Sequence, residues 1–355
     1  MLGGNPDGLG ELMRVLVTGG AGYIGSHACK ALAAAGHEPI VYDNFRTGHR
    51  WAVKWGPLER GNICDASRLA DVMRRWRPEA VMHFAALAYI GESVLKPDLY
   101  YQTNVVGTCT LLDAMRLSDV NRIVFSSTCA TYGAPRSMPI VETSPQVPVN
   151  PYGLSKLAAE AILRDHAETF GVAATALRYF NAAGADPDGE IGEEHDPEPH
   201  LLPLALQVAL GRRSRLSIFG EDYDTPDGTC VRDYVHVTDL AAAHLTALET
   251  AAEGTFAAYN LGTGSGASVR EVIAAVAEVT GRPVPARSAP RRPGDPPTLV
   301  ADATLAHQAL RWRARYQLRD MVESAWNWMT ENRSRVGLRA LSTPIPARGR
   351  KATKV

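Results

Sequence analysis

The sequence predicts an α/β protein built on a doubly wound parallel sheet, with a smaller second domain interleaved toward the C-terminus. Short apolar runs, typical of buried parallel strands, alternate with helix-like stretches in the first half of the chain. A glycine-rich loop follows the first of these runs directly. Beyond Gly184, Asp-Pro and Pro-Asp-Gly sequences mark long irregular connections, which indicate a change of domain.

The individual elements follow from apolar runs, glycines and helix-like stretches taken in order. Strands are expected at 14–18, 38–42, 80–84, 122–125 and 174–178. Helices are expected at 26–35, 68–76, 104–116 and 151–168. Because strand and helix alternate, the sheet should be parallel and covered by helices on both faces.

The domain boundaries follow from this order. We expect a first domain at 13–183, with returning elements within 234–265, and a second, interleaved domain at 184–331. Residues 1–12 are expected to be an unstructured extension. Residues 332–355 carry seven Lys or Arg and no acidic residue, and we interpret them as a basic, flexible tail.

Composition excludes several classes of protein. The chain has 355 residues and a formal net charge of −1, so without the basic tail its body is acidic and ill-suited to nucleic acid. No apolar run reaches the ~18 residues that a membrane span requires. The five cysteines form no C-x-x-C pair and the histidines no H-E-x-x-H pattern, so we expect no metal site, reduced thiols and a cytoplasmic location.

The glycine loop has the spacing of a dinucleotide site. Gly19, Gly22 and Gly25 lie between a strand and a helix, where glycine allows a tight turn and close approach of a pyrophosphate. Asp43 follows at the end of the next strand, about 20 residues on, where a carboxylate binds the adenosine ribose. The carboxylate would repel a 2′-phosphate, so NAD is favoured over NADP, although Arg46 lies nearby.

A second group of residues indicates acid–base chemistry. Tyr152 and Lys156 form a Y-x-x-x-K pattern, which places both side chains on one face of a helix. An ammonium near a phenol lowers the pKa of the phenol, so that it can act as an acid or base. Ser127 and Thr128 follow an earlier strand, at the sheet edge where ligands bind, and either could contact a substrate hydroxyl.

These motifs resemble those of the extended short-chain dehydrogenase/reductase family and, within it, the UDP-glucose 4-epimerase group. The resemblance covers residues 13–328 and includes four motifs outside the dinucleotide fold. They are Arg178-Tyr-Phe-Asn181, Val231-Arg-Asp-Tyr-Val-His236, Tyr259-Asn-Leu-Gly262 and Arg291-Arg-Pro-Gly-Asp295.

The resemblance implies a Rossmann-type NAD-binding domain and a nucleotide-sugar-binding domain. It implies Tyr152 as the catalytic base, Lys156 as its partner and Thr128 as a hydroxyl that assists the base and contacts substrate. The positions similar to cofactor contacts are Gly19, Gly22, Tyr23, Ile24, Gly25, Asp43, Asn44, Phe45, Arg46, Thr47, Gly48, Asn62, Ile63, Phe84, Ala85, Ala86, Leu87, Asn104, Tyr152, Lys156 and Phe180.

It also implies a set of nucleotide-sugar contacts. Two arginines from separate loops could converge on a diphosphate, because each guanidinium offers a planar fork of donors. An aspartate could accept a hydrogen bond from a ribose hydroxyl. The implied set is Thr128, Asn181, His200, Leu201, Ser217, Phe219, Arg232, Arg292, Asp295 and Leu299.

The chain departs from the family pattern at several positions. Ala88 stands where many epimerases have a lysine, Asn62 where an acidic residue lies near the adenine, and His200 where an asparagine is usual. Leu299 stands where a tyrosine or a smaller residue borders the sugar's 2-substituent, which leaves tolerance of an N-acetyl group open. Cys129 follows Thr128 where dehydratases carry an acid, so dehydration is disfavoured.

The resemblance therefore implies reversible conversion of UDP-galactose to UDP-glucose through a 4-keto intermediate. UDP-arabinose/UDP-xylose and UDP-N-acetylhexosamine 4-epimerases remain alternatives. A regulatory NAD-binding protein on the same fold remains a third, although both Tyr152 and Lys156 are present. The family resemblance also implies a homodimer.

Overall fold

A seven-stranded, all-parallel sheet forms the centre of the molecule, as expected from the sequence. The computed structural model describes residues 12–292 and 294–332. The strand order is β11-β6-β5-β4-β1-β2-β3. The strands are β1 (Arg14–Thr18), β2 (Glu38–Asp43), β3 (Leu58–Arg60), β4 (Ala80–His83), β5 (Arg122–Thr128), β6 (Ala173–Tyr179) and β11 (Phe256–Leu261). The order reverses between β1 and β4, and in such sheets ligands bind outside the carboxyl ends of the strands at this point.

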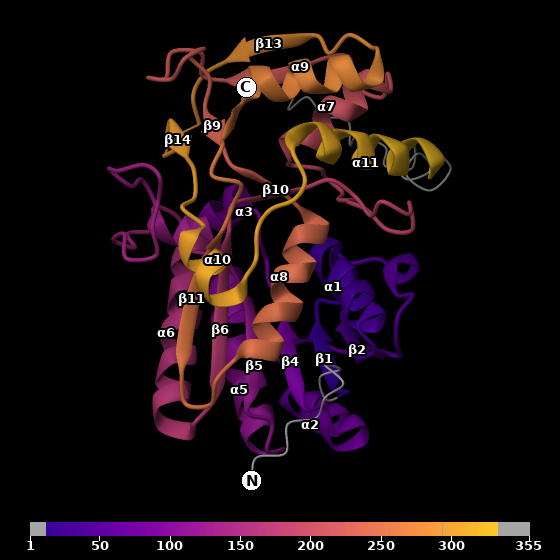
Figure 1. Cartoon of the computed structure of the whole chain (residues 1–355), viewed down its shortest axis with the longest axis vertical. Helices are drawn as coiled ribbons and strands as arrows, with labels where there is room; N and C mark the ends of the chain where they lie inside the picture. Colours follow the sequence, from indigo (N-terminus) through magenta and orange to yellow (C-terminus); the bar gives the residue numbers. More distant parts are fainter. Residues whose placement is uncertain (1–11, 293, 333–355) are drawn as a thin grey trace, which may run out of the picture.

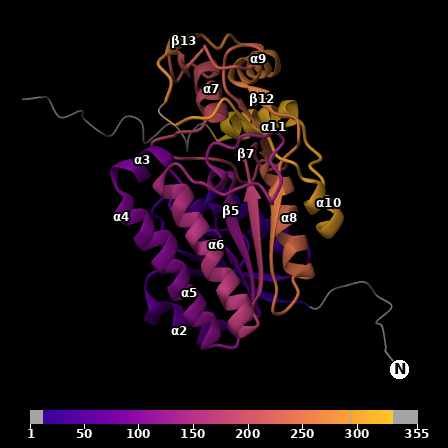
Figure 2. The ribbon, with the colours of Figure 1, turned by 90° about the vertical axis from the view of Figure 1, so that its left-hand side faces the viewer.

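Helices cover both faces of the sheet, each face with its own apolar core. One face is covered by α2 (Ala66–Trp76), α5 (Gly107–Arg116) and α6 (Pro151–Phe170). The other is covered by α1 (Tyr23–Ala34), α8 (Val237–Thr250) and α10 (Thr304–Leu310). Figure 2 shows α5 and α6 on one side of β5, and α8 and α10 on the other.

A smaller unit lies over one end of the sheet (Figure 1). Its core is formed by α7 (Leu201–Ala209), α9 (Val269–Thr280) and α11 (Leu318–Glu331). It also contains two small sheets. One pairs β8 (Leu216–Phe219) with β13 (Ala286–Ala289), and the other has three strands, β12 (Ala267–Ser268), β9 (Val231–Arg232) and β14 (Thr298–Leu299), with β9 in the middle. The two units are interleaved, because α8, β11 and α10 return to the sheet between segments of the smaller unit.

Short connecting elements complete the fold. A two-stranded parallel pair joins β7 (Asn181–Ala183) to β10 (Tyr234–His236). The remaining helical segments are η1 (Arg50–Ala52), α3 (Ile90–Leu95), α4 (Pro97–Tyr100), η2 (Tyr101–Val106) and η3 (Cys129–Tyr132). No helix in the described ranges combines the length and apolarity that crossing a bilayer would need.

Local sequence accounts for the boundaries of the helix that carries the Y-x-x-x-K pattern. The Asn150 side chain accepts a hydrogen bond from the backbone nitrogen of Gly153 (2.8 Å), and Pro151 occupies the first turn of α6. The helix ends at Gly171, which adopts a left-handed conformation (φ 73°) that glycine tolerates. Both signals are visible in the sequence, and the predicted start at 151 is confirmed.

Several predicted elements differ from the observed ones. β5 continues through Thr128 instead of ending at Phe125, because hydrogen bonds satisfy its hydroxyl side chains within the buried sheet. The helix expected to begin at 104 begins at Gly107, after the π-helical turn η2. The segment near Tyr234 pairs with β7 and does not join the central sheet. β3 was not predicted. Except for residues 12 and 332, the expected N-terminal extension and basic tail lie outside the described residues.

Candidate active site

The glycine loop lies at the carboxyl end of β1, next to the point where the strand order reverses. Gly19 has φ +73°, and a Cβ built on it would lie 2.6 Å from the backbone nitrogen of Ala85. Gly22 precedes α1, and no side chain caps that helix. The free amides at the start of α1 therefore face the loop as an anion-binding group.

Asp43 is tied to this loop. Its carboxylate accepts hydrogen bonds from the backbone nitrogens of Ala21 (3.0 Å) and Phe45 (2.7 Å). Burial raises the pKa of Asp43, and these two hydrogen bonds oppose the shift. Each carboxylate oxygen keeps a further lone pair, so the group can still accept a ribose hydroxyl. Nearby, Arg46 forms an ion pair with Glu92 (3.7 Å), which engages the cation that the sequence pointed to as able to favour NADP.

The segment after β4 is held by Asn104. The Asn104 side chain accepts from the backbone nitrogen of Leu87 (2.8 Å) and donates to the Leu87 carbonyl (3.0 Å) and the Ser155 hydroxyl (3.0 Å). Asn104 belongs to η2, and π-helical turns often occur at functional sites. Its side chain thus joins the predicted cofactor segment 84–87 to helix α6.

The remaining predicted cofactor residues lie around these groups. Tyr23 opens α1 and donates a hydrogen bond to the Gly184 carbonyl (2.6 Å), and Phe84 packs against His244. Ile63 and Phe180 are buried in apolar clusters, and the Asn62 side chain accepts from the backbone nitrogen of Cys64 (3.0 Å). Ile24, Asn44, Thr47, Gly48 and Ala86 lie on the segments that follow β1, β2 and β4.

Tyr152 and Lys156 extend from α6 toward the end of β5. The Lys156 ammonium donates to the Ser126 carbonyl (2.8 Å) and lies over the Phe125 ring, 4.6 Å from its centroid. Burial lowers the pKa of Lys156 to about 7, although Glu160 opposes this shift. Burial raises the pKa of Tyr152 well above its ordinary value, and a hydrogen bond with Thr128 opposes the increase.

This arrangement modifies the expected electrostatics. The sequence suggested that Lys156 lowers the pKa of Tyr152, but its ammonium is bonded to the backbone of β5 and burial dominates the pKa of the phenol. Thr128 is the last residue of β5, and its hydroxyl accepts from the backbone nitrogen of Ala130 (3.1 Å). The three predicted catalytic residues nevertheless share one buried region.

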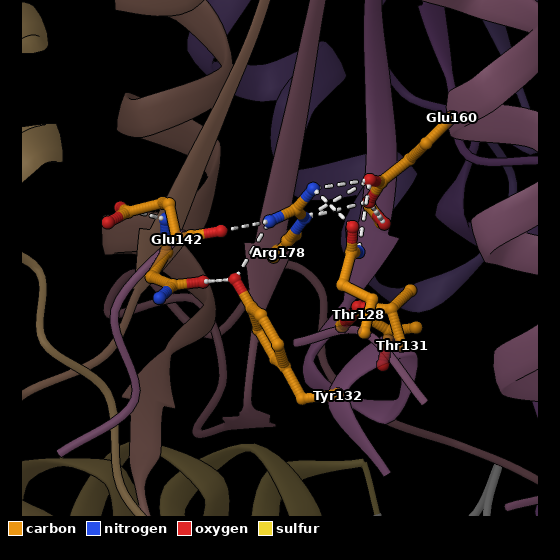
Figure 3. Close-up of polar contacts among 9 residues, drawn as sticks. Thr128, Thr131, Tyr132, Glu142, Glu160 and Arg178 are labelled. Atoms are coloured by element: carbon orange, nitrogen blue, oxygen red, sulfur yellow. Dashed lines mark hydrogen bonds and ion pairs between the residues drawn. The ribbon is translucent and has the colours of Figure 1, made fainter. Parts of the chain in front are cut away.

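A buried ion-pair network lies close to Thr128 (Figure 3). The Arg178 guanidinium binds both carboxylate oxygens of Glu160, with the shortest contact at 2.6 Å. It also donates to the Tyr132 hydroxyl (2.8 Å). Glu160 lies one helical turn beyond Lys156 and accepts a hydrogen bond from Ser127. The network therefore joins α6, which carries Tyr152 and Lys156, to β5 and β6.

Sequence reasoning did not identify this network. Glu160 follows Lys156 by four residues, so its place on the same helix face was a usable signal. Sequence reasoning also missed the hydrogen bond between the hydroxyls of Ser126 and Tyr179, which lie on neighbouring strands and have no local spacing to reveal it.

The smaller unit contributes the predicted nucleotide-sugar residues, and two of them meet. Arg232 forms an ion pair with Asp295, although 63 residues separate them in sequence. Arg292 does not join that pair; its guanidinium lies over the Phe219 ring, 4.0 Å from the centroid. Arg232 lies on β9 and not on a loop, whereas Arg292 follows β13, so their convergence on one diphosphate stays a prediction.

The other predicted sugar contacts are distributed around this face. Leu299 is buried and packs in one cluster with Phe180 and Cys129, next to the end of β5. Asn181 lies on β7, Ser217 on β8 and Leu201 at the first position of α7. His200 precedes α7, and its ring nitrogen lies 2.7 Å from Glu193.

The comparisons with known proteins agree with this fold and site. Residues 15–262 match the model of the NAD dependent epimerase/dehydratase family. A UDP-glucose 4-epimerase of Rhizobium leguminosarum bv. trifolii is 52% identical over 315 residues, which cover 88% of this chain and 96% of the relative.

Solved structures give the same result. The UDP-glucose 4-epimerase of Brucella ovis in complex with NAD is 52% identical, covers 88% of this chain and 97% of its own, and superposes with a TM-score of 0.85. The enzyme of Stenotrophomonas maltophila, with bound NAD and formylated UDP-arabinopyranose, is 40% identical, covers 91% and 99%, and has a TM-score of 0.87. The predicted fold class and family resemblance are confirmed: the chain belongs to the NAD dependent epimerase/dehydratase family.

Proposed function

We propose that this chain catalyses the NAD-dependent 4-epimerisation of a UDP-sugar, with UDP-galactose and UDP-glucose as the interconverted pair. The observation that carries the proposal is the convergence of Tyr152, Lys156 and Thr128 at the carboxyl ends of the strands, beside a glycine loop and Asp43. The identity to curated UDP-glucose 4-epimerases over nearly the whole chain supports it.

The residues at the reversal of strand order fit NAD. The amides at the start of α1 suit the pyrophosphate, Asp43 suits a ribose hydroxyl, and the segment 84–87 passes beside Gly19. Bound NAD would supply the acceptor that takes hydride from the sugar's C4 and returns it. The protein would hold the sugar and the cofactor in the orientation that the transfer requires, and it would move a proton.

Tyr152 is the group that would move this proton. In its phenolate form it accepts the proton of the sugar's 4-hydroxyl, and it returns a proton when the centre is inverted. Burial opposes the phenolate, so the hydrogen bond from Thr128 and a neighbouring positive charge are needed to stabilise it. Lys156 holds Ser126 at the end of β5 and places its ammonium in the same buried region.

The substrate would bind between the sheet and the smaller unit. Arg232 and Arg292 are the cations suited to the diphosphate, and Asp295 must release Arg232 or share it when a nucleotide binds. Leu299 borders the region next to Thr128 and offers an apolar wall to the sugar ring. An apolar wall suits a 4-keto intermediate that must present both faces to the cofactor.

The UDP-arabinose/UDP-xylose pair remains a second candidate, because Ala88 and the following Tyr89 also resemble that group of epimerases. Use of UDP-N-acetylhexosamine depends on the space beside Leu299. A homodimer and a cytoplasmic location remain predictions from the resemblance and from the cysteine pattern.

The proposal is tested first with the purified chain and no added cofactor. We expect UDP-galactose to be converted to UDP-glucose, with the products monitored by chromatography. The relative rates with UDP-N-acetylgalactosamine and UDP-arabinose then rank the sugars. Absence of conversion of all three, even with NAD supplied, would contradict the proposal.

Tyr152→Phe tests the mechanism. Removal of the phenol hydroxyl should lower kcat by ~10²-fold or more, because no other side chain moves the proton. The amount of bound NAD, measured after denaturation, should stay close to that of the wild type. The affinity for UDP should also be unchanged, because the phenylalanine ring still fills the site of the tyrosine ring. If the variant keeps most of its rate, Tyr152 is not the base.

A further inference from the structure

The loop before α7 brings together four side chains of the kinds that bind transition metals. Glu193, His195, Glu198 and His200 lie within eight residues of sequence. One ligand atom from each of them lies within 4.8 Å of those of the other three. The E-x-H-x-x-E-x-H spacing belongs to a loop rather than a helix, and it lies outside the patterns considered from the sequence.

The distances in this cluster fit a tetrahedral ion. The Nδ1 atom of His200 lies 2.7 Å from Glu193 and 3.0 Å from Glu198, and that of His195 lies 3.2 Å and 3.5 Å from the same carboxylates. Zinc binds histidine nitrogen and carboxylate oxygen at ~2.0–2.2 Å, which places neighbouring ligands of a tetrahedron about 3.3 Å apart. The four nitrogen–oxygen separations, from 2.7 to 3.5 Å, lie on both sides of this value, and the two shortest are also hydrogen-bonding distances.

The orientation of His195 points the same way. Its Nδ1 is buried and makes no hydrogen bond of acceptable geometry with any described residue, although two carboxylates lie nearby. A buried ring nitrogen is normally paired. The Nδ1 atom of His195 lies close to two carboxylate oxygens but is aligned with neither. A metal ligand would have this geometry, because its lone pair points at the ion between the oxygens.

Charge balance gives an independent argument. The side chains of Glu193 and Glu198 are 6% and 5% exposed, and within residues 12–292 and 294–332 their ion pairs are with these two histidines alone. The nearby acidic group Asp186, Asp188 and Glu190 differs, because the Lys30 ammonium lies 2.6–2.8 Å from all three. Two buried carboxylates without a lysine or arginine need two positive charges, which one divalent ion or two protonated imidazoles would supply.

We propose that Glu193, His195, Glu198 and His200 form a binding site for one divalent transition-metal ion of the zinc class. Two imidazoles and two carboxylates supply four ligands of types that zinc accepts, enough for a four-coordinate site. His200 is 43% exposed and gives the ion access from solvent. Because His200 directly precedes α7, the ion would fix the loop that leads to Leu201.

The test uses the full chain, produced without a histidine tag and treated with a chelator. Titration with ZnCl₂ in a calorimeter, with metal content measured after dialysis, should give one equivalent per chain and a higher Tm, because the ion binds the folded state. Co²⁺ in place of Zn²⁺ should give the intense visible absorption of a tetrahedral site.

Two variants and two controls complete the design. His195→Asn and Glu198→Gln each remove one ligand and should weaken Zn²⁺ binding by at least ~10-fold. His166→Asn and Glu190→Gln remove the same kinds of group elsewhere and should bind like the wild type. Circular dichroism and bound NAD content identify any variant that fails to fold, and the Co²⁺ spectrum of the wild type tests the geometry without a substitution.

The proposal is overturned if the wild-type chain binds no Zn²⁺, if both ligand variants bind it as tightly as the controls, or if Co²⁺ gives the weak spectrum of an octahedral complex. The first of these results would mean that two protonated histidines balance the carboxylates. Zinc binding is measured without substrate, so it stands or falls independently of the proposed epimerase activity.

Discussion

Burial controls the chemistry of the candidate catalytic residues. Tyr152 and Lys156 are both nearly inaccessible, and burial disfavours the charged form of each, raising the pKa of the phenol and lowering that of the ammonium to about 7. The Thr128 hydroxyl acts against this trend, because its hydrogen bond lowers the pKa of Tyr152. We therefore expect Thr128 to be the neutral side chain that assists formation of the phenolate.

Thr128→Val tests this role. Loss of the hydroxyl should lower kcat by ~10²-fold with a small change in KM, because it acts on proton transfer more than on binding. The pH at which kcat rises to half its maximum should also move upward. Thr128→Ser retains the hydroxyl and should recover most of the rate; an equally slow serine variant would indicate that the methyl group's packing is what matters.

The main structural support of the site is the contact between α6, β5 and β6. Arg178 and Glu160 are 3% and 1% exposed, so their charges are compensated almost entirely by each other and by neighbouring hydrogen bonds. An ion pair in this setting adds little net stability over apolar residues, but losing one partner leaves an unpaired buried charge. The pair fixes how α6 meets the strands that end at Ser127 and Thr128.

Glu160→Gln should therefore destabilise the fold by about 3–5 kcal/mol, because Arg178 loses its compensating charge. Urea unfolding, followed by circular dichroism, measures the change. Glu168→Gln is the matched control, because Glu168 lies exposed on the same helix, and it should unfold like the wild type. Arg178 also donates to the Tyr132 hydroxyl and to the Gln146 amide oxygen (3.2 Å), and equal stability of the two variants would show that these contacts suffice without Glu160.

Buried histidines make the whole molecule sensitive to acid. Burial lowers the pKa of His83 to about 3 and those of His236 and His244 to about 4, because the interior disfavours imidazolium. In the unfolded chain these groups titrate near 6.5. Between the two values the unfolded state binds more protons, so stability is complete above about pH 6.5 and falls as the pH decreases toward 4.

The urea midpoint should accordingly decrease between pH 7 and pH 5, with each histidine contributing up to ~1.4 kcal/mol per pH unit. His244→Met should reduce the decrease, because it removes one titrating group from the apolar face covered by α8. His307→Gln, at a histidine that stays accessible on α10, should leave the decrease unchanged. A His244→Met variant with the full acid sensitivity would exclude this histidine as a cause.

Much of the fold and part of the site could be read from local sequence. Strand β1, the glycine loop, Asp43 and the Tyr152–Lys156 spacing were all predicted, because each depends on residues close together in sequence and on the periodicity of one element. The resemblance extended this reading to the cofactor and substrate class. The parallel order of the sheet also followed, since the strands alternate with helices.

Other features depend on contacts that no local pattern encodes. Asp295 meets Arg232 across 63 residues, Glu160 meets Arg178 across 18, and β10 pairs with β7 instead of the central sheet. The Lys156 ammonium binds the backbone of β5, so burial rather than the neighbouring charge controls the pKa of Tyr152. Burial, and the partner of each buried charge, are set when distant segments of the chain pack together. Only the tertiary structure could therefore show them.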